Sequence, residues 1–227
     1  MAVTRDDART HVLGQIRVHL SAARAVEAAP EAPPGSGEVG QCAMPEDVAG
    51  RVARFKSVLE TVGGEVTIAA DHDEAARTLR HIVATRHVRR LAVSDDDLVS
   101  DFAADLQDVE LVASDDREAL LGCDAGLSGA QWGVAETGSL VLSSAAERHR
   151  LVSLLPTVHV ALLRATRILG GLDEALRHVA DAGPDGLPRA LTFVTGPSRT
   201  ADIELTLVVG VHGPKELHVI VLQEDIA

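Results

Sequence analysis

Apolar and polar positions along this chain recur with two periods, which predict helices and strands in turn. Between Pro45 and Val62, and again between Asp73 and Thr85, apolar residues recur every three to four positions, as in a helix. Short aliphatic and β-branched runs follow at Glu65–Ala69 and Arg90–Val93, as in buried strands. The alternation continues in three further segments: a helix ending near 106, a strand at 109–113 and a helix at 115–121. Strands and helices joined by short connections are typical of a parallel α/β sheet.

The second half of the chain contains longer apolar runs that glycine and proline interrupt. The run 127–144 is predicted to be a strand punctuated by glycines. Gly171–Ala182 is predicted to be a helix with Leu172, Ala175, Leu176 and Val179 facing inward. Further strand-like runs are predicted at 158–163, 190–195, 205–209 and 216–222.

The first 44 residues differ from the rest in pattern and composition. Asp6–Val26 carries apolar residues at four-residue spacing, which predicts an amphipathic helix. Ala28–Gly40 is rich in alanine, proline and glycine and is predicted to be a linker. The predicted organisation is a helix at 1–27, a linker at 28–44 and an α/β domain at 45–227. Such a helical appendage could swap between the subunits of a homo-oligomer.

Charge and composition narrow the classes of partner. The net charge of −13, with one Trp, three Phe and no Tyr, disfavours nucleic acid as a partner. Cys42 and Cys123 lie far apart and have neither a disulfide-framework nor a metal-cluster spacing, which favours a reducing cytoplasm. No stretch has the composition of a secretory signal or of a membrane span, so we expect neither.

The stretch from Thr195 to Pro214 concentrates polar groups between turns. Gly196 and Pro197 end a strand-like run, and the next positions supply two hydroxyls, a guanidinium and a carboxylate: Ser198, Thr200, Arg199 and Asp202. Because loops at strand ends face a crevice in open α/β sheets, we expect this loop to bind a ligand. Arg199 could grip a carboxylate or phosphate, or it could pair with Asp202 or Glu204 and fix the loop.

Several other polar residues allow two interpretations each. His212 suits a general acid or base, although a hydrogen-bonded turn residue is the commoner case. Glu136 lies in a strand-like run and is expected to be substantially buried, as a functional acid or as a structural acceptor. Asp95, Asp96 and Asp97 favour a helix cap over a metal site. Trp132 favours core packing over a place in a pocket wall.

Four sequence blocks together resemble the LutC/YkgG proteins, whose domain is the lactate-utilisation (LUD) domain. The blocks are Ala135–Val141, Leu154–His159, Gly196–Glu204 and Gly210–Pro214. The resemblance runs from about Val48 to the C-terminus and is strongest after Gly129. It implies a NagB/RpiA/CoA-transferase-like fold, with three layers built on a parallel sheet.

The resemblance also implies a function. The chain would be the cluster-free component of a complex that oxidises L-lactate to pyruvate, with LutA-like and LutB-like iron–sulfur proteins as partners. No cofactor is expected on this chain itself, and the iron–sulfur clusters would belong to the partners. In this hypothesis a small organic acid binds at Arg199, and these residues line the site: Glu136, Thr137, Gly138, Gly196, Ser198, Thr200, Asp202 and His212.

Two alternatives remain, and they leave open whether the chain is catalytic. One is a stand-alone enzyme acting on an acyl-CoA or folate-like substrate, with Glu136 as nucleophile or base, by analogy with CoA transferases and 5-formyltetrahydrofolate cyclo-ligase. The other is a ligand-sensing module without turnover.

Overall fold

The computed structural model divides the chain into two compact units, Met1–Cys42 and Ala43–Ala227. It describes residues 9–11, 13–15, 17–18, 44–113, 117–144, 150–181, 188–201, 207–210 and 212–223. The described residues of the first unit are helical and exposed, and they lie within the range predicted to be the N-terminal helix. Most of the predicted linker lies outside the described residues. None of the described helices is long and apolar enough to cross a membrane.

A six-stranded sheet, parallel throughout, forms the centre of the second unit. Its order is β1 (Glu65–Ala69), β12 (Glu216–Leu222), β7 (Val158–Arg164), β4 (Ala125–Gly129), β2 (Arg90–Val93) and β3 (Glu110–Ala113). The parallel α/β class predicted from the alternating pattern is therefore confirmed.

A smaller sheet and a hairpin accompany the main sheet. The smaller sheet has the order β8 (Ile168–Leu169), β5 (Trp132–Val134), β6 (Ser139–Ser143) and β9 (Leu191–Val194). The hairpin pairs β10 (Arg199–Ala201) with β11 (Leu207–Val209). The run 127–144 is thus not one punctuated strand. It supplies the end of β4 in the main sheet and then both strands of the β5–β6 hairpin in the other.

Three helices each begin after an aspartate whose side chain accepts a hydrogen bond from the first turn: Asp47 for α2 (Val48–Thr61), Asp71 for α3 (His72–Thr85) and Asp96 for α4 (Asp97–Ala104). Such a cap satisfies a backbone N–H that has no partner within the helix. The helix-cap interpretation of the Asp95–Asp97 run is therefore confirmed. Across the described ranges, no three His, Cys, Asp or Glu side chains gather where they could hold a metal ion.

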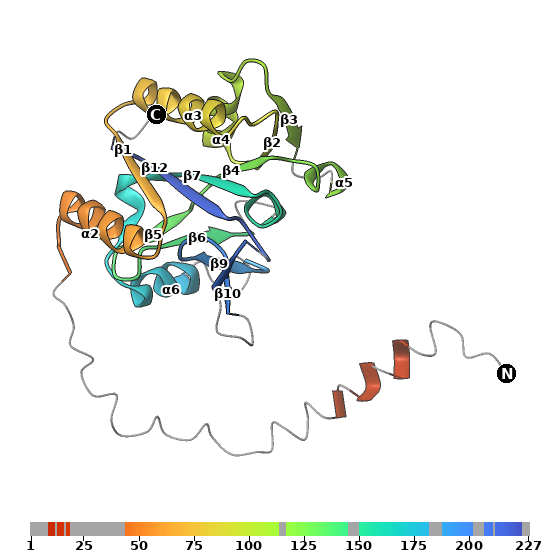
Figure 1. Ribbon diagram of the computed structural model, residues 1–227. Coiled ribbons are helices and arrows are strands. Elements are labelled where there is room, and N and C mark those ends of the chain that lie inside the picture. Colours follow the sequence, from red (N-terminus) through yellow and green to blue (C-terminus); the bar gives the residue numbers. More distant parts are fainter. Residues whose placement is uncertain are drawn as a thin grey trace. The chain divides into compact units, whose positions relative to one another are not determined.

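Helices and the smaller sheet cover the main sheet on both faces (Figure 1). On one face, α3 and α4 bury Leu79 and Phe102 against strand residues that include Leu127. On the other face, α2 and the smaller sheet bury Phe55 and Leu140. Short α5 (Arg117–Leu120) and the 3-10 turn η1 (Arg150–Ser153) cover the sheet near β2 and β3.

The last helix, α6 (Leu172–Asp181), packs on the outer side of the smaller sheet. It buries only Ala175 fully, whereas Leu172 and Leu176 are 39% and 48% exposed. The prediction that both leucines face inward is wrong, because α6 covers a four-stranded sheet from one side and leaves part of its apolar stripe uncovered.

The strands β2 and β4 are neighbours, but the chain leaves them in opposite directions. From β2 it runs through α4 to β3 at one margin of the sheet, whereas from β4 it proceeds to β7 on the other side. Such a reversal opens a crevice outside the carboxyl ends of the strands, where α/β proteins bind ligands. We call the strand ends at Val93, Gly129 and Arg164 the carboxyl edge, and the opposite end of the sheet the amino edge.

Candidate functional site

The predicted site residues lie in two turns and a hairpin. Glu136, Thr137 and Gly138 form the turn between β5 and β6. Gly196 and Ser198 lie in the loop after β9, Arg199 and Thr200 begin β10, and His212 lies in a bend before β12. Asp202 and the side chain of Thr200 lie outside the described residues.

A chain of hydroxyl groups joins the β5–β6 turn to the loop after β9. The Thr137 Oγ1 and Ser139 Oγ atoms are 2.7 Å apart, and Ser139 Oγ is 2.6 Å from Thr195 Oγ1. Both segments also press against the C-terminal end of α2. A Cβ added to Gly138 would lie 2.6 Å from the Leu59 nitrogen, and one added to Gly196 would lie 3.0 Å from the Val62 oxygen. The β5–β6 turn and the loop after β9 therefore lie side by side, but the backbone at the end of α2 packs closely against both.

The two charged groups expected to share a pocket point to different helices. The Arg199 guanidinium donates to the carbonyl of Val62 at 2.6 Å, where it satisfies an acceptor at the end of α2. Glu136 is exposed, and its Oε2 accepts from the Leu172 N–H, 3.3 Å away, at the start of α6. The expectation that Glu136 is buried is wrong, because it occupies a turn and not a strand. Of its two interpretations, the structural acceptor matches the contact observed.

Ser198 and Pro214 lie at the amino edge, on either side of the β10–β11 hairpin. The Ser198 N–H donates to the Pro214 carbonyl, and the Ser198 carbonyl accepts from the Gly210 N–H, both at 2.8 Å. The Lys215 N–H donates to the Thr157 carbonyl, next to the start of β7. The preceding strand, β9, belongs to the smaller sheet, so this segment does not follow a strand of the main parallel sheet. His212 is exposed in this loop.

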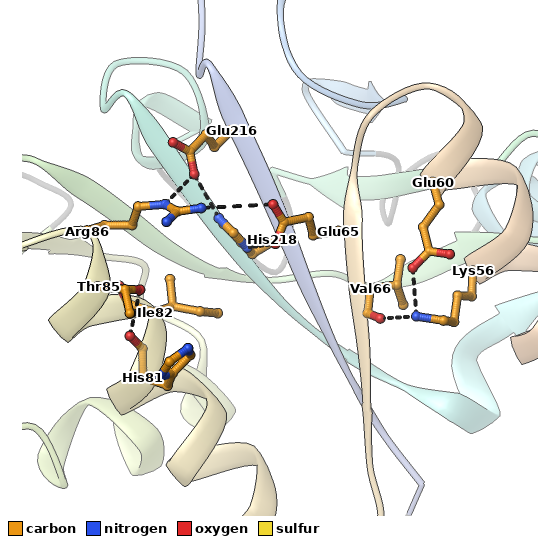
Figure 2. A network of polar contacts seen from close by, with 10 residues as sticks. All are labelled: Lys56, Glu60, Glu65, Val66, His81, Ile82, Thr85, Arg86, Glu216 and His218. Carbon is orange, nitrogen blue, oxygen red and sulfur yellow. Dashed lines mark hydrogen bonds and ion pairs between the residues drawn. The ribbon is translucent and has the colours of Figure 1, made fainter.

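A network of ionic contacts also lies at the amino edge, between α3 and the starts of β1 and β12 (Figure 2). Arg86 Nε donates to Glu216 Oε2 at 2.5 Å, and Arg86 Nη2 lies 3.9 Å from Glu65 Oε1. The buried His218 ring places Nδ1 3.2 Å from Glu65 and Nε2 3.1 Å from Glu216. Burial acts to raise the pKa of Glu216, but the hydrogen bonds from Arg86 and His218 outweigh it and lower that pKa.

A cavity of about 440 Å³ opens at the carboxyl edge, on the crevice between β2 and β4. Its walls come from the residues that follow three neighbouring strands. They are Asp95–Leu98 after β2, Gly129–Trp132 after β4, and Arg164 and Arg167 after β7. Of the predicted site residues that the structure describes, none lines this cavity.

Two neighbouring side chains of the cavity wall, Gln131 and Trp132, are held in place by contacts within the protein. The Gln131 side-chain oxygen accepts from the Ser143 N–H at 2.5 Å, which fixes the side chain on β6. The Trp132 ring stacks on the His178 ring of α6, with centroids 5.9 Å apart. Trp132 thus packs against its neighbours and also lines the cavity. The sequence interpretation treated these as alternatives.

A buried polar pair lies in the sheet beside this cavity. His159 Nε2 and Ser128 Oγ are 2.9 Å apart, and both side chains are inaccessible to solvent. Nδ1 of His159 has no hydrogen-bond partner in the part of the chain that the structure describes. Burial lowers the pKa of His159 to about 4, so the imidazole is neutral at pH 7. This serine and histidine line none of the cavity described above.

Sequence reasoning missed the two arginines of the cavity and gave its aspartates only a capping role. Arg164 ends β7 and Arg167 ends the 3-10 turn η2 (Ala165–Arg167). Both follow a strand that had been predicted correctly, so their position after a parallel strand was the available signal. Strand order was the missing information, because it decides which strand ends are neighbours.

Comparison with known proteins identifies the family. The LUD domain model matches residues 52–222. Lactate utilization protein C of Halalkalibacterium halodurans is 39% identical over 103 residues, covering 44% of this chain and 45% of that protein. The uncharacterised protein YkgG of Escherichia coli is 44% identical over 98 residues, covering 42% of each. The aligned stretches therefore span less than half the length of these relatives.

A solved structure has the same architecture. The crystal structure of a DUF162 family protein from Deinococcus radiodurans superposes with a TM-score of 0.57 and covers 79% of this chain and 100% of its own. At 22% identity, this likeness concerns the fold alone. The family match covers most of the α/β unit, and the chain belongs to the LUD domain family, with LutC and YkgG proteins among its relatives.

Proposed function

We propose that this chain acts in lactate utilisation and binds a small organic acid in the cavity at the carboxyl edge. Family membership and the relatives named lactate utilization protein C support the role. The observation that carries the binding proposal is the cavity itself. It lies at the strand reversal between β2 and β4, and Arg164 and Arg167 line it.

The lining chemistry suits a carboxylate. A guanidinium binds a carboxylate through charge-assisted hydrogen bonds, and it stays protonated at every physiological pH. Arg167 is exposed, and its guanidinium forms no ion pair with any residue that the structure describes. Glu136 caps α6 and is not part of the cavity, so no observation favours a nucleophilic carboxylate and an acyl-CoA substrate.

The wider assembly is part of the same proposal. This chain would be the cluster-free component of a cytoplasmic complex in which LutA-like and LutB-like partners carry the iron–sulfur clusters and L-lactate is oxidised to pyruvate. The scarcity of cysteine supports this division, since the whole chain has two and Cys123 is a buried free thiol. Cluster ligation by cysteine takes four thiolates.

The only tryptophan of the chain provides a direct test of binding. Because Trp132 lines the cavity, a ligand that enters should change its fluorescence. We expect a saturable change on titration with L-lactate, and a loss of affinity of about tenfold or more in Arg167→Gln. The matched control is Arg77→Gln, which removes an exposed arginine of α3 that is not part of this cavity. If no small carboxylic acid changes the fluorescence or releases heat in calorimetry, the binding proposal fails.

The assembly requires a separate experiment. The tagged protein, purified without oxygen from cells grown on lactate, should bring down iron–sulfur proteins, and deletion of its gene should slow growth on lactate. Normal growth of the deletion strain, together with purification free of iron, would contradict the proposed role.

A further inference from the structure

Asp97 and Arg167 line the cavity at the carboxyl edge with charges of opposite sign and form no ion pair with each other. Asp97 begins α4 on one wall, and Arg167 ends η2 on the other. In the described part of the chain, neither side chain forms an ion pair or a side-chain hydrogen bond. The cavity therefore offers a ligand an acceptor-only group on one side and a donor-only group on the other.

The neighbouring aspartates have other roles, so Asp97 is the acceptor best placed for a ligand. Asp96 accepts the Leu98 N–H at 2.9 Å as the cap of α4. Asp95 also takes part in an interaction within the protein. The positive end of the α4 dipole stabilises the charge of Asp97. The Asp97 carboxylate oxygens remain free to accept hydrogen bonds from a ligand.

We propose that Asp97 makes this site select 2-hydroxy acids over the corresponding 2-oxo acids. The inference rests on the proposed function, because it assumes that the arginine side of the cavity holds a carboxylate. A 2-hydroxyl group can donate a hydrogen bond to the Asp97 carboxylate. A 2-oxo group has no proton to donate, and its oxygen would face a negative charge.

The preference for a 2-hydroxy acid over a 2-oxo acid can be measured as a ratio of affinities. A hydrogen bond to a charged group is stronger than one between neutral groups, and a site that binds a substrate hydroxyl discriminates against an analogue without it. The volume of about 440 Å³ leaves space beyond a three-carbon acid. The preference therefore concerns the 2-hydroxy acid group and not one chain length.

The experiment compares three acids of equal length on the intact chain. L-lactate, pyruvate and propionate differ only at carbon 2, and their dissociation constants would be measured by calorimetry and by Trp132 fluorescence. We expect lactate to bind about tenfold or more tighter than pyruvate, with propionate between them. In Asp97→Asn the amide can donate as well as accept, so pyruvate should gain affinity, lactate should lose it, and the ratio should approach one.

The matched control is Asp101→Asn, which removes an equal charge one turn later on α4, outside the cavity. It should leave the ratio of affinities unchanged. Equal binding of lactate and pyruvate to the native chain would overturn the selectivity and leave the proposed acid site intact. An unchanged ratio in Asp97→Asn would also overturn the role of Asp97. If none of the three acids binds, both proposals fail.

Discussion

The two edges of the main sheet carry similar kinds of side chain but arrange them differently. At the amino edge, Arg86 and His218 each lie within hydrogen-bonding distance of Glu216. At the carboxyl edge, Asp97 and Arg167 line one cavity but stay apart. Groups that neutralise each other contribute to stability, whereas groups held apart remain available to a ligand.

Several described residues in or beside the four sequence blocks that carry the family resemblance also make contacts within the protein. Arg199 caps α2, Ser139 and Thr195 share a hydrogen bond, and Ser198 joins two loops through its backbone. A polar residue bracketed by glycine is therefore no sign of a ligand site by itself. The cavity differs in its place at the strand reversal and in two of its charged groups, Asp97 and Arg167, which pair with no residue that the structure describes.

The largest effect on stability is expected at Gly138, where the turn between β5 and β6 contacts α2. Gly138 has a φ of +63°, and an added Cβ would lie 2.6 Å from the Leu59 nitrogen and 2.9 Å from its Cα. Gly138→Ala combines backbone strain with a clash against backbone, and should lower the free energy of unfolding by about 2–4 kcal/mol. Urea unfolding would measure it. Gly170→Ala is the control, because its added Cβ would make only ordinary contacts.

An unchanged stability in Gly138→Ala would show that the turn does not press on α2 as described. The glycine would then be available for the ligand-binding role that the sequence suggested.

A polar pair between the two edges should give stability a dependence on pH. Burial lowers the pKa of His159 to about 4, below the value of about 6.5 in an unfolded chain. The unfolded state therefore takes up the proton first. The contribution is complete above pH 6.5 and is lost as the pH falls from there towards 4, on the order of 3 kcal/mol.

His159→Gln keeps an amide near Ser128 but cannot titrate. Its free energy of unfolding should be lower than that of the native chain at pH 7, and the difference should shrink as the pH falls to 4.5. The matched control is His81→Gln, which makes the same substitution at an exposed position of α3. A constant difference in His159→Gln would mean that His159 has the same pKa in the folded and unfolded states.

The sequence was sufficient for most of the main sheet, whose inner strands β12 and β7 are buried on both faces. The bounds of β1, β2 and β12 were predicted as they are observed, since each is an apolar run between polar turns. It failed for the run 127–144, where the chain leaves one sheet and starts another. Local pattern does not say which strand a residue pairs with, so the exposed turn at Glu136 was taken for a buried strand.

The site was harder to predict than the fold, for a related reason. Asp97, Trp132 and Arg167 come from three separate connections, and they meet only because β2, β4 and β7 are adjacent. No spacing in the sequence encodes that order. By contrast, Arg199 and Ser198 are neighbours in sequence, and they drew attention for that reason alone.

The smallest effects on the free energy of unfolding are expected from changing one acid to its amide at each edge. These two substitutions also compare the edges most directly. Glu216→Gln removes the negative charge that Arg86 and His218 share, and should cost about 1 kcal/mol of unfolding free energy, since Glu216 and Arg86 are partly solvent-exposed. This contribution is present at neutral pH, above the carboxyl pKa of the unfolded chain. It is lost as the pH falls through the lowered pKa of Glu216. Asp97→Asn should cost less than about 0.5 kcal/mol, because only the dipole of α4 stabilises that charge. Urea titrations at pH 7 and pH 4 separate the two. Equal losses of unfolding free energy would mean that Asp97 is paired as strongly as Glu216. Asp97 would then not be available to bind a ligand.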